Sequence, residues 1–254
     1  MPALRALRRH ARRVTLAAHP GAARLLAGLG EVEVGLAFDD PRLGWVFGAG
    51  PPPRPRPRVV AWLDAAARLA VRPEVLAPSR PADARTHCAQ HLLASVCPGG
   101  RLDARILDIT PRISGEVLVH PGSGSPRKNW PAERFAAVVA GLLARGVATR
   151  LVVGEADTSA ARAVERQVGR PLPRIEHPDL EDLAARLAGC RAYLGNDSGV
   201  SHLAGLAGAR SVVLFGPTPA AVWRPLGPRV HVMSFSADPA EVLAALEAAR
   251  NALG

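Results

Sequence analysis

The chain has 254 residues, of which 48% are hydrophobic, and carries a formal net charge of +10 at pH 7. This length suits one large domain or two small ones, and the hydrophobic content excludes wholesale disorder. The charge alone would fit nucleic acid, an anionic membrane or phosphorylated substrates. Only 4% of the residues are aromatic and the arginines are scattered, so no stacking platform for bases is expected and we predict that the chain binds no nucleic acid.

The first half of the chain shows an irregular α/β pattern. Strands are expected at 12–19 and 31–38, with a short helix between them at 20–28. Two further helices are expected at 59–70 and 82–96. The pattern therefore predicts an N-terminal α/β domain with few strands.

Proline and glycine mark the breaks of this half. The run "PPPRPRPR" at 51–58 is expected to form a surface loop. The segment 98–115 has the turn and extended content of a connection between domains. We place the boundary near residue 110, with domains at 1–110 and 111–254.

The second half alternates strands with helices. Strands are expected at 116–122, 149–154, 173–177, 191–196, 210–216 and 229–234. Helices are expected at 131–146, 158–168, 179–189, 199–207 and 238–253. Near-continuous apolar strands that alternate with helices predict a parallel, doubly wound sheet.

Three cysteines, Cys88, Cys97 and Cys190, form no CxxC pair and no metal-ligand spacing. This pattern is typical of reduced thiols in a cytosolic protein, and it predicts no metal site. No apolar run is long enough to span a membrane, and the first residues lack the apolar region of a signal peptide. We expect a cytoplasmic protein, and the basic charge leaves peripheral association with an anionic inner-membrane face open.

The stretch "HPGSGSPRKNWP" at 120–131 contains Lys128, the only lysine of the chain. It follows a predicted strand and precedes a helix, which is where open α/β sheets bind ligands. Its glycines allow an anion to approach the backbone, Ser123 and Ser125 offer hydroxyls, and the helix N-terminus attracts negative charge. Lys128 adds a compact charge that can reach between two phosphates. The stretch predicts phosphate binding, although an ordinary strand–helix loop can have the same composition.

A second loop, "GNDSGVSHLAGLAG" at 195–208, also leads from a strand into a helix. Asp197 and Ser198 are good N-caps, and Gly199 permits close approach of a ligand. Alone, this loop reads as a capped helix start. Together the two loops hold two of only three asparagines in the chain, and this pairing favours a shared anion site. A third loop at 214–228 offers Trp223 and Arg224 as lining, with simple packing as an equal explanation.

The stretches "HPGSGSPRKNWP", "NDSGVSHLAGLAG" and "LFGPTPAAVW" resemble, in order and spacing, the ADP-heptose:lipopolysaccharide heptosyltransferases of glycosyltransferase family 9. The resemblance is strong over about residues 115–235. It implies the GT-B architecture, with two Rossmann-like domains and parallel sheets. The N-terminal domain would face a glycan or lipopolysaccharide-type acceptor, and the C-terminal domain would hold a nucleoside-diphosphate-sugar donor such as an ADP-sugar. The resemblance also implies an inverting transfer that needs no metal or cofactor.

The resemblance carries individual residues with it. The implied diphosphate contacts of the first loop are Ser123, Gly124 and Lys128. The implied phosphate and sugar contacts of the second loop are Asp197, Ser198, Gly199, Val200 and His202. Glu155 is similar to an acid that binds the ribose, with a solvated carboxylate as the alternative, and Pro178 stands in the implied adenine-side loop.

The N-terminal side departs from the family pattern. Family members begin with a strand and a Gly-Asp loop whose aspartate is the proposed general base, whereas this sequence begins at what resembles the following helix. We therefore expect an incomplete N-terminal domain and leave the catalytic base unassigned. Asp39 and Asp40 form the nearest acidic pair, with a loop or cap role favoured, and His19 and His87 have no stronger claim. Three explanations stay open: a misassigned start, a short enzyme with another base, and a catalytically impaired nucleotide-sugar binding protein.

Overall fold

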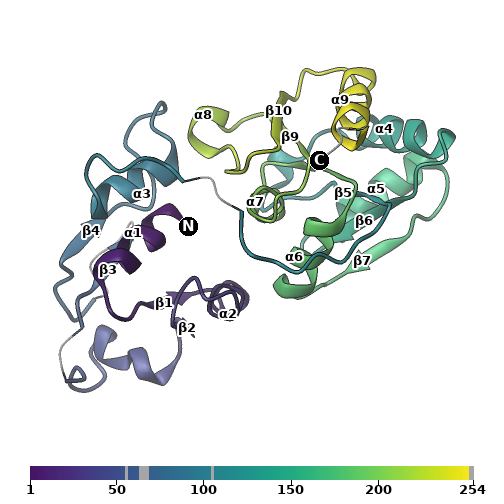
Figure 1. The fold of residues 1–254 in the computed structure, drawn as a ribbon. Helices are drawn as coiled ribbons and strands as arrows, with labels where there is room; N and C mark the ends of the chain where they lie inside the picture. The colour runs from purple at the N-terminus through teal and green to yellow at the C-terminus, as the bar shows by residue number, and fades with distance from the viewer. Residues whose placement is uncertain (55–56, 63–68, 104–105, 252–254) are drawn as a thin grey trace. The chain divides into compact units, whose positions relative to one another are not determined.

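The computed structural model describes residues 1–54, 57–62, 69–103 and 106–251. The chain divides into two compact units, Met1–Asp103 and Ala104–Gly254 (Figure 1). Every strand pairing in both units is parallel among the described residues. The predicted α/β class with parallel sheets is thus confirmed.

The N-terminal unit contains two small parallel sheets, β1–β2 and β3–β4, and the helices around them. Its elements are α1 (Pro2–His10), β1 (Thr15–Ala18), α2 (Pro20–Gly28), β2 (Val34–Ala37), η1 (Pro41–Phe47), β3 (Val60–Trp62), β4 (Val75–Ala77) and α3 (Cys88–Val96). The expected strands at 12–19 and 31–38 and the helix at 20–28 are present.

Two helix predictions in this unit were wrong in part. Residues 60–62 form strand β3, because this β-branched and aromatic run pairs with Val75–Ala77, and the prediction over 63–68 lies outside the described residues. Helix α3 begins at Cys88, because the ring of His87 accepts the Ala89 amide as an N-cap. The preceding residues turn around Asp83, whose Oδ1 accepts the amides of residues 85 and 86.

The C-terminal unit is a six-stranded parallel sheet with helices on both faces (Figure 1). Its strands are β5 (Val117–His120), β6 (Thr149–Val153), β7 (Arg174–Glu176), β8 (Ala192–Asn196), β9 (Ser211–Phe215) and β10 (Val230–Ser234). Its helices are η3 (Pro126–Lys128), α4 (Ala132–Ala144), α5 (Thr158–Val168), α6 (Leu180–Gly189), α7 (Gly199–Leu206), α8 (Ala220–Trp223) and α9 (Pro239–Asn251). The strand order is β10-β9-β8-β5-β6-β7. The order therefore reverses between β5 and β8, as in doubly wound nucleotide-binding folds.

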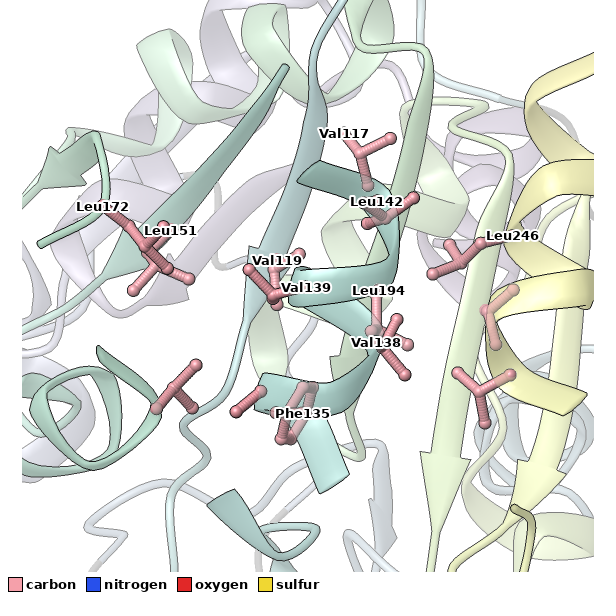
Figure 2. Packing of buried hydrophobic residues seen from close by; sticks show 14 of the residues in the cluster. Val117, Val119, Phe135, Val138, Val139, Leu142, Leu151, Leu172, Leu194 and Leu246 are labelled. Carbon is pink, nitrogen blue, oxygen red and sulfur yellow. The ribbon is translucent and has the colours of Figure 1, made fainter. Parts of the chain in front are cut away.

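A large apolar core holds one face of this sheet (Figure 2). Alternate residues of the central strands, such as Val117, Val119 and Leu194, pack against Phe135 and Leu142 of α4. All five of these side chains are fully buried, and burial of each large apolar side chain contributes about 1.5–3 kcal/mol. The apolar core thus holds β5 and β8 in place, and with them the loops that follow their carboxyl ends.

The three cysteines are free thiols. Burial raises the pKa of the Cys190 thiol to about 12, and burial also raises the pKa of Cys88. Within the described ranges, no group of three His, Cys, Asp or Glu residues is arranged to hold a metal ion. No described helix is both long and apolar enough to cross a membrane.

Candidate functional site

The candidate site lies where β5 and β8 end side by side. These strands pair in parallel, with Val117 opposite Ala192 and His120 opposite Gly195. The loop after β5 and the start of α7 after β8 therefore leave the sheet at the same edge, at the point where the strand order reverses. Ligands of open α/β sheets bind at this position.

Asn196, the last residue of β8, joins the two loops. Its side chain is fully buried. Its Oδ1 accepts the Trp130 amide at 2.9 Å, and its Nδ2 donates to the carbonyls of Pro121 at 2.8 Å and Gly122 at 3.2 Å. One side chain thus satisfies three backbone groups at both ends of the first loop, which fixes the shape of that loop.

The first loop is held by its own side chains. Ser123 is buried, and its Oγ lies 2.7 Å from both the Ser125 carbonyl and Asn129 Oδ1. The Lys128 amide donates to the Ser125 carbonyl at 2.9 Å. Gly124 is exposed at the tip of the loop, with open space where a Cβ would stand. Ser123 is therefore committed to loop structure, and Gly124 offers exposed backbone.

Lys128 reaches across to the second loop. Its Nζ lies 3.2 Å from Oδ2 of Asp197, and three quarters of the Lys128 side chain is buried. The same Oδ2 accepts the hydroxyl of Thr218 at 2.7 Å, from the third loop. His202 Nε2 lies 3.9 Å from the other oxygen of Asp197. Three loops therefore meet at one carboxylate.

The second loop opens helix α7. Ser198 is its N-cap, and Ser198 Oγ accepts the Ser201 amide at 3.3 Å. Gly199 is exposed with no atom near its would-be Cβ, and Val200 is half-buried beside it. The helix dipole places partial positive charge at this exposed first turn.

A buried polar network lies beneath both loops. His120 Nε2 is 2.9 Å from Asp157 Oδ2, and His120 Nδ1 is 3.2 Å from Ser198 Oγ. Asp157 also accepts the Gly154 amide at 3.0 Å. Burial raises the pKa of Asp157, but the hydrogen bonds from His120 and Gly154 outweigh burial and leave that pKa below its usual value. The buried carboxyl is therefore ionised at neutral pH.

A second layer supports the start of α7 from below. The Tyr193 hydroxyl lies 2.9 Å from Ser201 Oγ, and Ser201 donates to the Asn196 carbonyl. Burial raises the pKa of Tyr193 above its usual value. Gly195 has no room for a side chain, because a Cβ would lie 2.2 Å from the Tyr193 hydroxyl oxygen. The first turn of α7 therefore rests on a fixed hydrogen-bonded floor.

Two predicted site residues stand on other loops than the three that meet at Asp197. Glu155 is exposed in the turn after β6, and Pro178 is half-buried in the loop after β7. Both follow strands on the β6–β7 side of the switch point. Among the described contacts to Asp197, the third loop contributes Thr218, whereas Trp223 and Arg224 end the short helix α8.

The N-terminal candidates have structural roles in their own unit. Asp40 caps η1 and binds the Arg42 guanidinium, and these hydrogen bonds lower the pKa of Asp40 to about 2. His19 is the N-cap residue of α2, and His87 caps α3. Asp39 is exposed after β2. The cap role expected for the acidic pair thus applies to Asp40.

Sequence reasoning assigned no individual role to four residues that shape the site: His120, Asp157, Asn196 and Thr218. Asn196 carried a signal, since asparagine is rare in this chain. Asp157 stands two residues after Glu155, and the sequence does not distinguish which carboxylate turns inward. The contacts of His120 and Thr218 are long-range and have no signature in local spacing.

Comparison with known proteins agrees with this fold. In E. coli, ADP-heptose lps heptosyltransferase II shares 18% identity and a TM-score of 0.74, over 98% of this chain and 93% of that chain. A family 9 glycosyl transferase from Veillonella parvula DSM 2008 shares 20% identity and a TM-score of 0.59, over 69% of this chain and 63% of its own length. E. coli heptosyltransferase WaaC with ADP gives 17% identity and a TM-score of 0.53, over 65% of this chain and 57% of that chain. These similarities define a heptosyltransferase-like α/β fold.

A family model for glycosyltransferase family 9 (heptosyltransferase) matches residues 103–248, which include all three loops of the site. The chain belongs to glycosyltransferase family 9. A search of curated protein sequences finds no match.

Proposed function

We propose that the chain transfers a sugar, such as a heptose, from a nucleoside-diphosphate donor to a glycan or lipopolysaccharide-type acceptor. The C-terminal unit binds the donor at the β5–β8 switch point, and the N-terminal unit faces the acceptor. The contact between Lys128 and Asp197 carries this proposal, because it brings the only lysine of the chain to the edge where a nucleotide would lie. The ADP in the WaaC structure supports an ADP-sugar donor.

Transfer builds negative charge on the departing diphosphate, and preorganised positive groups lower that barrier. Lys128 supplies an ammonium, and the start of α7, where Gly199 is exposed, supplies backbone amides and a dipole. Asp197 holds the ammonium in the free protein. When a diphosphate arrives, the amine moves to the phosphate oxygens, while Asp197 keeps Thr218 and turns its second oxygen toward the donor sugar.

The proposed transfer inverts the anomeric carbon in one displacement, without a metal. Such a step needs a base for the acceptor hydroxyl, and a base works best when its pKa lies near the working pH. The pKa of Asp40 is about 2, so Asp40 is a poor base. The proposal assigns no general base.

The experiment that tests this function measures binding and turnover separately. Calorimetry with ADP, UDP and GDP is expected to show binding of ADP. Mass spectrometry with an ADP-sugar and lipopolysaccharide-core acceptors is expected to show a glycosylated product, with and without a chelator. ADP binding without product on any acceptor would contradict a transferase and leave a nucleotide-sugar binding protein. Absence of all nucleotide binding would contradict the proposed site itself.

A further inference from the structure

His120 occupies an unusual position at the end of a buried strand. It follows the apolar run Val117–Val119 of β5, and its side chain is only 2% exposed. Both ring nitrogens have partners, Asp157 on one side and Ser198 on the other. An apolar residue would fill this space without the need for two hydrogen-bond partners. The role of the imidazole therefore lies in its hydrogen bonds to Asp157 and Ser198.

The two contacts of His120 differ in kind. Asp157 lies after β6, accepts from Nε2–H and packs against Gly122, where a Cβ would lie 1.9 Å from its Oδ1. Ser198 begins α7, and its Oγ faces Nδ1 while it also accepts the Ser201 amide. The Nε2 contact thus joins the end of β5 to the turn after β6, and the Nδ1 contact holds the cap oxygen of α7.

We propose that His120 is a positioning residue for the donor, acting through Ser198 on the first turn of α7. This inference rests on the proposed function, because that turn is where the diphosphate is proposed to bind. His120 and Ser198 are 2% and 5% exposed, and the Ser198 oxygen is engaged as a cap. The Asp157–His120–Ser198 chain is therefore a support for α7 and offers no exposed nucleophile.

Two substitutions separate the contacts. The amide of asparagine overlays the Nδ1 position of histidine, so His120→Asn keeps a partner for Ser198 and loses the contact with Asp157. The amide of glutamine overlays the Nε2 position, so His120→Gln keeps the contact with Asp157 and loses Ser198. A residue that only fills space would lose more from the smaller asparagine than from glutamine, which is the opposite of the order expected here for ADP affinity.

The test measures ADP affinity by calorimetry and thermal unfolding for both variants of the full chain. His120→Gln is expected to weaken ADP binding by about fivefold or more, the effect of a lost buried hydrogen bond, with a smaller fall in Tm than in His120→Asn, because the buried Asp157 carboxylate keeps its partner. His120→Asn is expected to lower Tm and to keep ADP affinity within about twofold of wild type. His231→Gln, an exposed histidine on β10, serves as the matched control and should change neither quantity.

Equal affinity losses in both variants, or no loss in either, would overturn the positioning role. A wild-type chain that binds none of ADP, UDP and GDP would instead overturn the proposed function. In that case hydrogen exchange at the Ser201 amide decides whether His120 holds α7. Faster exchange in His120→Gln than in His120→Asn supports the link, and equal exchange contradicts it.

Discussion

The ammonium of Lys128 lies 3.2 Å from the carboxylate of Asp197, across 69 residues of sequence. This ion pair connects the loop after β5 with the start of α7, at the point where the strand order of the sheet reverses. It gives the lone lysine of the chain a defined place without a ligand. A bound diphosphate would also compete with Asp197 for the ammonium of Lys128, because both carry negative charge.

The competition predicts the effect of Asp197→Asn. Removal of a negative charge beside Lys128 is expected to tighten ADP binding about two- to fivefold, since even in water a charge pair at this separation is worth about 1 kcal/mol. Calorimetry at low and high salt measures the gain, which should shrink as salt screens it. A loss of ADP affinity would show that Asp197 is needed to orient the ammonium.

Asn196 is expected to be a major support of the site. Asn196→Ala leaves three buried backbone groups without their partner, the Trp130 amide and the carbonyls of residues 121 and 122. The expected cost is at least about 2 kcal/mol of unfolding free energy. Urea unfolding measures it, and Asn251→Ala at the exposed end of α9 is the control, with a change within about 0.5 kcal/mol. Equal changes of the unfolding free energy in the two variants would contradict the bridging role of Asn196.

Gly122 is expected to reject a methyl group. A Cβ there would lie 1.9 Å from Asp157 Oδ1, whereas Gly124 two residues on has open space. Gly122→Ala should lower the unfolding free energy by about 1–3 kcal/mol through overpacking, and Gly124→Ala should change it by less than about 0.5 kcal/mol. Thermal unfolding of the two variants side by side provides the measurement. A tolerated Gly122→Ala would contradict the packing of Asp157 against this loop.

The buried carboxyl predicts a pH dependence. Burial raises the pKa of Asp157, but its interactions with His120 and Gly154 lower that pKa by more. The pKa of Asp157 in the folded protein is therefore below its value in the unfolded chain, which is about 3.9. Its stabilisation is therefore present above that unfolded value and is lost as pH falls through the folded value. The stability gap between wild type and Asp157→Asn should be larger at pH 6 than at pH 3 in urea titrations. Glu155→Gln, an exposed neighbour, should show no comparable gap, and a gap that grows at pH 3 would contradict the ionised state.

The sequence predicts the C-terminal unit well for a physical reason. Each expected strand over 116–234 contains an observed strand, because buried parallel strands are apolar runs bounded by turn residues. The N-terminal unit is less regular. The periodicity of the run at 59–62 is compatible with both a helix and a strand. Residues 60–62 form a strand because they pair with Val75–Ala77.

The candidate site shows the same division. Lys128 and Asn196 stand out in the sequence through their rarity. The pairing of His120 with Asp157, 37 residues apart, depends on how two neighbouring strand ends are packed. Local spacing carries no information on that packing. The sequence alone therefore does not distinguish whether Glu155 or Asp157 turns inward to contact His120.

The most direct test of the donor site is calorimetry of ADP binding to Lys128→Ala. The proposed grip of an ammonium on the diphosphate predicts a loss of at least about tenfold in affinity, or about 1.4 kcal/mol, with the loss reduced at high salt. Arg127→Ala, which removes an exposed charge from the adjacent residue, should bind ADP nearly as well as wild type. Unchanged ADP affinity in Lys128→Ala, or equal losses in both variants, would contradict a diphosphate site at the β5–β8 edge.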